Sequence, residues 1–250
     1  MSTIETTILP VPAVRAFAPT SDHRPTSWEA VTVDIYRDVH KGIRAELFAV
    51  TEAAGRTDAG DAAARQALAA HVRGLVGLLD EHAEHEDVHI GAVLAEQLPE
   101  LHERVEGDHA DFERQTQTVV ALAAEAAAST GPDARRLTSR LYGDLAAFTG
   151  VYLLHQEVEE RIVMPALEAA IGFPATLAVN QAIVASIPPD RMAASLALMI
   201  PAMNVDDRTE LLGGMQAGAP PEVFAGVWSL VGSVLDPADT DALARRLGIA

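Results

Sequence analysis

Two thirteen-residue stretches of the chain repeat one arrangement of metal-ligating residues. The first begins at His82 and reads H-A-E-H-E-D-V-H-I-G-A-V-L, and the second begins at His155 and reads H-Q-E-V-E-E-R-I-V-M-P-A-L. In each copy a glutamate, Glu86 or Glu159, follows the histidine by four residues. Residues four apart lie on one face of a helix, so each pair could grip one metal ion or two neighbouring ions. A single H-x-x-x-E motif is common on solvated helices, and the second copy gives the pattern its weight.

Composition favours helices and restricts the possible metal ligands. Of 250 residues, 49% are apolar and 4% are aromatic, so a core would consist mainly of Ala, Leu and Val. An alanine-rich chain favours helices. The chain has no Cys, which excludes thiolate-ligated zinc, iron–sulfur clusters, disulfides and cysteine nucleophiles. Any metal site must therefore use nitrogen and oxygen ligands.

The charge and hydropathy of the chain exclude several classes of partner. The formal net charge is −18, which argues against binding to nucleic acid or to an anionic membrane surface. The first residues lack the basic and apolar regions of a signal peptide. We expect no apolar run of membrane-spanning length, because Pro201 interrupts the best candidate. The expectation is a soluble, cytoplasmic protein.

Turn residues and hydrophobic periodicity divide the chain into an arm, a bundle and an extension. Residues 1–25 contain four prolines and no helical period, which predicts an extended or disordered arm. A capping box from Thr26 to Glu29 predicts the start of the first helix. Long helices are expected over residues 26–55, 61–97, 100–128 and 133–171, joined by short loops. This pattern is typical of an all-α, up-down-up-down four-helix bundle, here at residues 26–172, with a helical C-terminal extension at 173–250.

Loop positions predict that four histidines lie at one height in this bundle. In two antiparallel helices, residues equidistant from the connecting loop lie at the same level. Each successive pair in the series His40, His82, His109 and His155 is centred on the loop between its helices, and the two glutamates of the repeat lie one turn away. Four imidazoles and two carboxylates suit two metal ions about 3.5–4 Å apart with bridging carboxylates. Burying them without metal would leave several polar groups unpaired, each at a cost of about 1–3 kcal/mol.

These donors favour a redox-capable centre of two iron ions of the Fe–O–Fe type, with manganese or zinc also possible. The pattern His40, His82-x-x-x-Glu86, His109, His155-x-x-x-Glu159 resembles the hemerythrin-like (HHE cation-binding) domain, and E-E-x-I-V-M-P-x-L is similar to the signature of that family's fourth helix. The resemblance covers roughly residues 27–171. It implies a four-helix bundle around a non-haem di-iron centre that binds dioxygen or nitric oxide, or senses oxygen and iron. It also implies that these six residues are the ligands.

The sequence departs from the oxygen-carrying members of that family, which place a fifth histidine four residues from the one on helix three. Here Val105 and Glu113 occupy the positions four before and four after that histidine, so a seventh ligand is unassigned. Glu113 could supply a carboxylate, and Tyr36 could supply a phenolate or a hydrogen bond. His85 could reach the inner rim of the site. His89 could form a hydrogen-bonded core pair with His102 or be partly exposed. It could also belong to a second metal site or supply a ligand from a distorted helix.

Three functions follow from such a centre. The first is binding or sensing of O2 or NO. The second is a di-iron enzyme of the peroxidase, oxidase or oxygenase type, which a general acid near the metal would favour. The third is an iron reporter whose folding depends on metal occupancy. The expected partners are a small ligand (O2, NO or peroxide) and, through the C-terminal helices, a second copy or another protein, with no nucleic acid and no membrane.

Overall fold

The computed structural model describes residues 30–249, so the predicted N-terminal arm and the capping box lie outside the described residues. Within 30–249 the chain forms helices and no strand, which confirms the all-α prediction. The elements are α1 (Arg37–Arg56), α2 (Ala62–Glu86), the π-helical turn η1 (Asp87–Gly91), α3 (Ala92–Gln97), α4 (Pro99–Ala128), α5 (Gly131–Val158), the π-helical turn η2 (Glu159–Val163), α6 (Met164–Ser186), α7 (Pro189–Ala202), α8 (Val205–Gly218), α9 (Pro221–Val234) and α10 (Pro237–Leu247).

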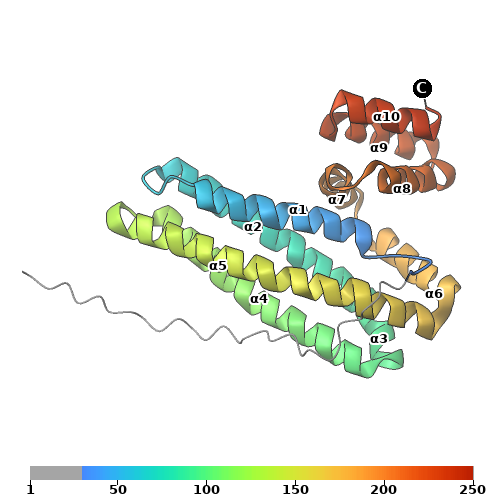
Figure 1. The fold of residues 1–250 in the computed structure, drawn as a ribbon, viewed down its shortest axis with the longest axis horizontal. Helices are drawn as coiled ribbons and strands as arrows, with labels where there is room; N and C mark the ends of the chain where they lie inside the picture. The colour runs from blue at the N-terminus through green and yellow to red at the C-terminus, as the bar shows by residue number, and fades with distance from the viewer. Residues whose placement is uncertain (1–29, 250) are drawn as a thin grey trace, which may run out of the picture.

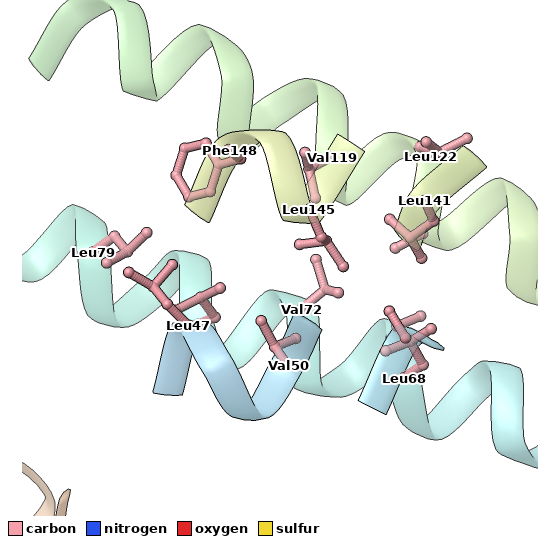
Figure 2. Packing of buried hydrophobic residues seen from close by; sticks show 14 of the residues in the cluster. Leu47, Val50, Leu68, Val72, Leu79, Val119, Leu122, Leu141, Leu145 and Phe148 are labelled. Carbon is pink, nitrogen blue, oxygen red and sulfur yellow. The ribbon is translucent and has the colours of Figure 1, made fainter. Parts of the chain in front are cut away.

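Four long helices, α1, α2, α4 and α5, lie side by side (Figure 1). Helix α1 packs against α2 and α5, and α4 packs against the same two helices. Leucine, valine and phenylalanine side chains from all four helices point toward one another in Figure 2, and Leu47, Val72 and Leu145 are almost fully buried. Full burial of such a side chain contributes about 1.5–3 kcal/mol. This core therefore fixes the rotation of each helix, and with it the face that each helix presents further along the bundle.

Capping side chains begin several helices, and the cap of α2 lies at the start that the sequence predicts. Asp61 accepts hydrogen bonds from the backbone N–H groups of Ala63 and Ala64 at the start of α2. Asn204 caps α8 in the same way, and Asp236 accepts from the N–H of Asp239 in α10. Each of these acceptors satisfies N–H groups that have no partner inside the helix.

The segment directly before α1 is not helical, so the prediction of a helix starting before it is wrong there. Oδ1 of Asp34 accepts hydrogen bonds from the N–H groups of Tyr36, at 3.1 Å, and Arg37, at 2.9 Å. An Asp side chain that bonds to N–H groups two and three residues later favours a helix start at that point. Val31 and Ile35, which lie in this non-helical segment, pack against a second hydrophobic cluster beside α6.

Helix α6 bends at the predicted end of the bundle and continues. Gly172 has φ 76° and ψ 162°, a left-handed conformation that interrupts the helix, and Pro174 follows. Beyond the bend, Val179 and Ile183 still pack against the second cluster, whose buried members are Tyr36, Ile90, Leu94, Val105, Val163, Met164 and Leu167. Helix α6 therefore crosses residue 172, and the division of the chain into domains at that residue stays a prediction.

One helical stretch, Gly131–Ser186, is long and apolar enough to span a membrane by length and composition alone, and 22% of its most apolar window is buried. This finding differs from the expectation that no apolar run reaches that length. The difference arises because the fourth long helix was expected to end at residue 171, whereas helical hydrogen bonding continues past the bend at Gly172 to Ser186.

The C-terminal extension forms its own small core and lies against α1. Leu196, Ile200, Leu212, Val231 and Leu243 form this third cluster, which is drawn from α7 to α10. Helix α7 approaches α1 closely, because a Cβ placed on Gly42 would lie 3.2 Å from Cγ of Leu198. Lys41 forms an ion pair with Asp207 on α8. Helix α1 thus belongs to both parts of the chain (Figure 1).

Candidate metal centre

Four imidazole rings, one from each long helix, meet in two pairs. Nε2 of His40 on α1 lies 3.3 Å from Nε2 of His82 on α2. Nε2 of His109 on α4 lies 3.2 Å from Nε2 of His155 on α5. The prediction that these histidines share one height in the bundle is therefore confirmed. Two ring nitrogens this close, facing each other, can bind one ion as neighbouring ligands.

Glu86 lies between the two pairs and offers one oxygen to each. Its Oε1 is 3.0 Å from Nε2 of His82 and 3.9 Å from Nε2 of His40. Its Oε2 is 3.4 Å from Nε2 of His109, on the opposite side. This is the arrangement of a carboxylate that bridges two metal positions.

Glu159 repeats this arrangement from the other half of the chain. Its Oε1 is 3.0 Å from Nε2 of His155 and 3.7 Å from Nε2 of His109. Its Oε2 is 3.5 Å from Nε2 of His40. Each pair of histidines therefore faces one oxygen of each glutamate, which makes two sets of two nitrogens and two oxygens.

A π-helical turn follows each histidine–glutamate pair and keeps the repeated stretches facing inward. In an α-helix four residues turn through about 400°, which is about 40° more than one full turn. After three such steps the side chain has moved about 120° around the helix. The stripes His82, Glu86, Ile90, Leu94 and His155, Glu159, Val163, Leu167 use three such steps, yet every member is buried. The wider turns η1 and η2 remove the drift. In the second copy Pro165 also lacks the N–H that an α-helix would use there.

The residues of this site fit a metal cation. All four carboxylate oxygens of Glu86 and Glu159 are buried without a hydrogen-bond partner among residues 30–249. Unpaired buried carboxylates are costly, and a cation removes that cost. Ligand atoms of Glu86, His109, His155 and Glu159 lie within 4.8 Å of one another, and so do those of His40, His82 and Glu86. Nitrogen and oxygen donors without sulfur suit iron, manganese and zinc.

A family model for the hemerythrin HHE cation-binding domain matches residues 31–167, which is more than half of the chain. The chain belongs to this family. No similar protein was found among the curated proteins or among the solved structures. The match covers the four long helices and all six predicted ligands of the hemerythrin HHE domain, whose function as a cation-binding domain agrees with the donor set.

Three carboxylates that sequence reasoning missed surround the histidines of this hemerythrin HHE domain. Each accepts a hydrogen bond from the outer ring nitrogen, Nδ1, of one histidine. The pairs are Glu160 with His40 at 3.0 Å, Asp87 with His109 at 2.8 Å and Asp108 with His155 at 3.3 Å. Protonation of Nδ1 leaves the lone pair on Nε2 free to bind metal. The only available signal was that each carboxylate is adjacent in sequence to a predicted ligand.

Burial and the neighbouring ionisable groups change the pKa values of the site in opposite directions, and the neighbouring groups have the larger effect. Burial lowers the pKa of His40, but the neighbouring carboxylates of Glu160 and Glu86 raise it to about 9. Burial also lowers the pKa of His155, and the charge of Glu159 leads the effects that raise it to about 9. Burial raises the pKa of Glu86, yet the surrounding histidines hold it well below its usual value. Without metal, His40 and His155 are therefore protonated beside an ionised Glu86, so a metal ion must displace protons.

The metal-free protein is expected to lose stability as the pH rises from about 6.5 to about 9. Folding raises the pKa of His40 and His155 from 6.5 to about 9, so their protonation contributes stability that is complete below 6.5 and is lost as the pH passes through 9. Thermal unfolding with and without a chelator measures this effect. The metal-loaded protein, whose rings are already deprotonated, should change less over this range. A metal-free Tm that stays level or rises with pH would contradict the assignment.

Two buried tyrosines flank the carboxylates. The ring centroid of Tyr36 lies 5.1 Å from that of His40, and the ring centroid of Tyr152 lies 5.7 Å from that of His155. Burial, followed by the charges of Glu86 and Glu159, raises the pKa of both phenols well above the usual value. The phenols are therefore held in the protonated form, in which each can donate a hydrogen bond. Tyr36 was a sequence candidate, and Tyr152 was not.

The other candidates for a seventh ligand lie outside both ligand groups. Glu113 is exposed on α4, where its Oε1 accepts a hydrogen bond from Gln117 at 3.3 Å. Nδ1 of His85 lies 3.3 Å from Oγ of Ser186 on α6. His89 is partly buried in η1. The two groups of residues that could hold a metal ion therefore contain the six predicted residues, and of the further candidates Tyr36 lies beside them.

Proposed function

We propose that this chain is a non-haem di-iron protein that binds or senses O2 or NO inside an up-down-up-down four-helix bundle. The observation that carries the proposal is the pair of matching donor sets, each with two Nε2 atoms and two carboxylate oxygens. His40 and His82 would hold one iron, and His109 and His155 the other. Two irons would supply redox chemistry toward a small ligand such as O2, NO or peroxide.

The residues around the site would hold such a ligand in an apolar, water-poor space. The ring of Phe112 lies 5.0 Å from the ring of His155 and 4.9 Å from that of Tyr152, so an aromatic wall covers the α4 and α5 side. Tyr36 covers the α1 side and is 2% exposed. A protonated phenol at this position would donate a hydrogen bond to a bound ligand, and the aromatic wall would limit exchange with water.

Optical spectra of the iron-loaded protein test this function. The anaerobic protein is loaded with ferrous iron and exposed separately to O2, NO and peroxide, with zinc-loaded protein as the redox-inactive control. The proposal expects two irons per chain and a new absorption with O2 or NO that reverses when the gas is removed. Iron-loaded protein whose spectrum responds to neither gas would overturn the gas-binding function.

A second candidate function, a di-iron enzyme that consumes peroxide or oxidises a substrate, is favoured by the two buried phenols. Each phenol lies beside a histidine of the site and could donate a proton or a hydrogen atom to a reacting ligand. Sustained loss of peroxide over many cycles, which Tyr36→Phe slows, would support the enzyme. Turnover that Tyr36→Phe and Tyr152→Phe both leave unchanged would remove the reason for preferring it.

Iron reporting is a third candidate, because α1 carries both a predicted ligand and the main contact with the C-terminal extension. His40 faces the site, while Arg37 lies 3.1 Å from Glu210 and 3.7 Å from Asp207 on α8. We propose that this extension contacts a second copy or another protein in the cytoplasm. The net charge of −18 supports a role without nucleic acid or membrane. Hydrogen exchange in α8 that does not change when iron is removed would oppose this candidate.

A further inference from the structure

The two halves of the domain support their histidines with symmetric outer carboxylates. Asp87, the residue directly after the first bridging glutamate, lies 2.8 Å from Nδ1 of His109 in the other half. Glu160, the residue directly after the second bridging glutamate, lies 3.0 Å from Nδ1 of His40 in the first half. The sequence repeat therefore extends one position beyond the ligands, and each half steadies a histidine of the other.

A third outer carboxylate breaks this symmetry. Asp108, one residue before the histidine of α4, lies 3.3 Å from Nδ1 of His155 on α5. Helix α1 packs on α2 as α4 packs on α5, and the corresponding residue, one before the histidine of α1, is Val39. Within residues 30–249, the only carboxylate near His82 is the bridging Glu86, which faces Nε2 and leaves Nδ1 without an acidic partner.

Burial does not distinguish the two pairs of histidines, so the difference between them lies in their outer partners. The side chains of His82 and His109 are each 8% exposed, and those of His40 and His155 are almost fully buried. Val39 is partly buried against the main hydrophobic core, and its side chain has no atom that can accept a hydrogen bond. Of the four histidines, His82 is therefore the one whose Nδ1 has no carboxylate partner among residues 30–249.

An outer carboxylate changes how tightly its histidine binds metal. It fixes the tautomer with the proton on Nδ1, it holds the ring in place, and it raises the basicity of Nε2. Loss of such a partner typically weakens metal binding about 10–100-fold. Glu160 is itself held by Arg44, at 2.8 Å, so His40 is well supported. Among the four histidines, only His82 lacks such an outer carboxylate.

We propose that the two metal positions are unequal and that the ion bound by His40 and His82 leaves first. Val39 causes the difference, because it stands where Asp108 supports His155 in the other half. This inference rests on the proposed function, in which the site holds two ions. It assigns Asp108 as a positioning residue, and it makes one ion of the centre exchangeable while the other stays in place.

Release of iron to a chelator tests the inference. Anaerobic full-length protein loaded with ferrous iron is mixed with an excess of a coloured iron chelator, and release is followed with time. The wild type should lose its two ions in two phases of equal size, with rates about 10–100-fold apart. Asp108→Asn should accelerate the slow phase by a similar factor and leave the fast phase unchanged. Asp111→Asn, an exposed change on the same helix, is the matched control and should alter neither phase.

The reverse substitution gives a second, independent result. Val39→Asp should slow the fast phase. Val39→Asn, whose side chain has the shape of aspartate without its charge, should slow this phase less. If Val39→Asp does not fold, Asp108→Asn still decides the matter. Two bound ions that leave the wild type in one phase, or a slow phase that Asp108→Asn does not accelerate, would overturn the inference alone. Fewer than two ions per chain at saturation would overturn the proposed function and the inference together.

Discussion

Glu159→Gln is expected to reduce the bound metal from two ions per chain to one or none, and Glu86→Gln should have the same effect. Glutamine keeps the shape of the side chain but removes the charge and one of the two acceptor oxygens. Each glutamate offers an oxygen to both pairs of histidines, so either change weakens both metal positions. Elemental analysis after anaerobic loading with iron and desalting measures the loss.

Glu113→Gln is the matched control for this pair of variants. Its carboxylate is exposed on α4 and hydrogen-bonded to Gln117, outside both ligand groups. It should therefore retain two ions per chain. If Glu86→Gln and Glu159→Gln also retain two ions, the two glutamates do not bridge the metal positions, and the arrangement derived from their oxygen distances is wrong.

Removal of metal is expected to lower the Tm of the protein by roughly 5–11 °C for each ion, when the free metal concentration before removal is 100 times the Kd. Such binding contributes about 2.7 kcal/mol, and each kcal/mol shifts the Tm of a chain of this size by about 2–4 °C. The physical cause is local, because in the metal-free protein the four buried carboxylate oxygens face only histidine rings and make no well-formed hydrogen bond. Thermal unfolding by circular dichroism, before and after treatment with a chelator, gives the difference.

The doubly substituted protein with Glu86→Gln and Glu159→Gln separates this effect from general stabilisation by metal. Its Tm should not respond to added iron, because the metal positions are lost. A wild-type Tm that is the same with and without metal would show that the buried carboxylates are satisfied in another way. An equal shift in the double variant would place the stabilising metal elsewhere on the chain.

The sequence predicted the part of the site that depends on helix periodicity and loop position. The spacing between His82 and Glu86, repeated at His155 and Glu159, needs only that both stretches are helical. The common height of the histidines needs only short loops between long helices. Both conditions hold, since α2 and α5 begin directly after short connections. The six predicted residues therefore meet, and their role as metal ligands is the prediction that the experiments above test.

The features that the sequence did not predict depend on contacts between helices or on small rotations. Asp87 and Glu160 point away from the stripe of ligands on their own helices, and only the packed bundle places them beside histidines of other helices. Glu113 lies four residues after His109, which made it a candidate. His109 already lies at the edge of the buried face of α4, so a further rotation of about 40° carries Glu113 into solvent.

An anomalous difference map from crystals of the iron-loaded protein tests the central claim most directly. Two peaks are expected about 3.5–4 Å apart, one beside Nε2 of His40 and His82 and the other beside Nε2 of His109 and His155. Both peaks should also lie next to oxygens of the two glutamates. A single peak, or peaks away from these four nitrogens, would contradict a centre of two ions.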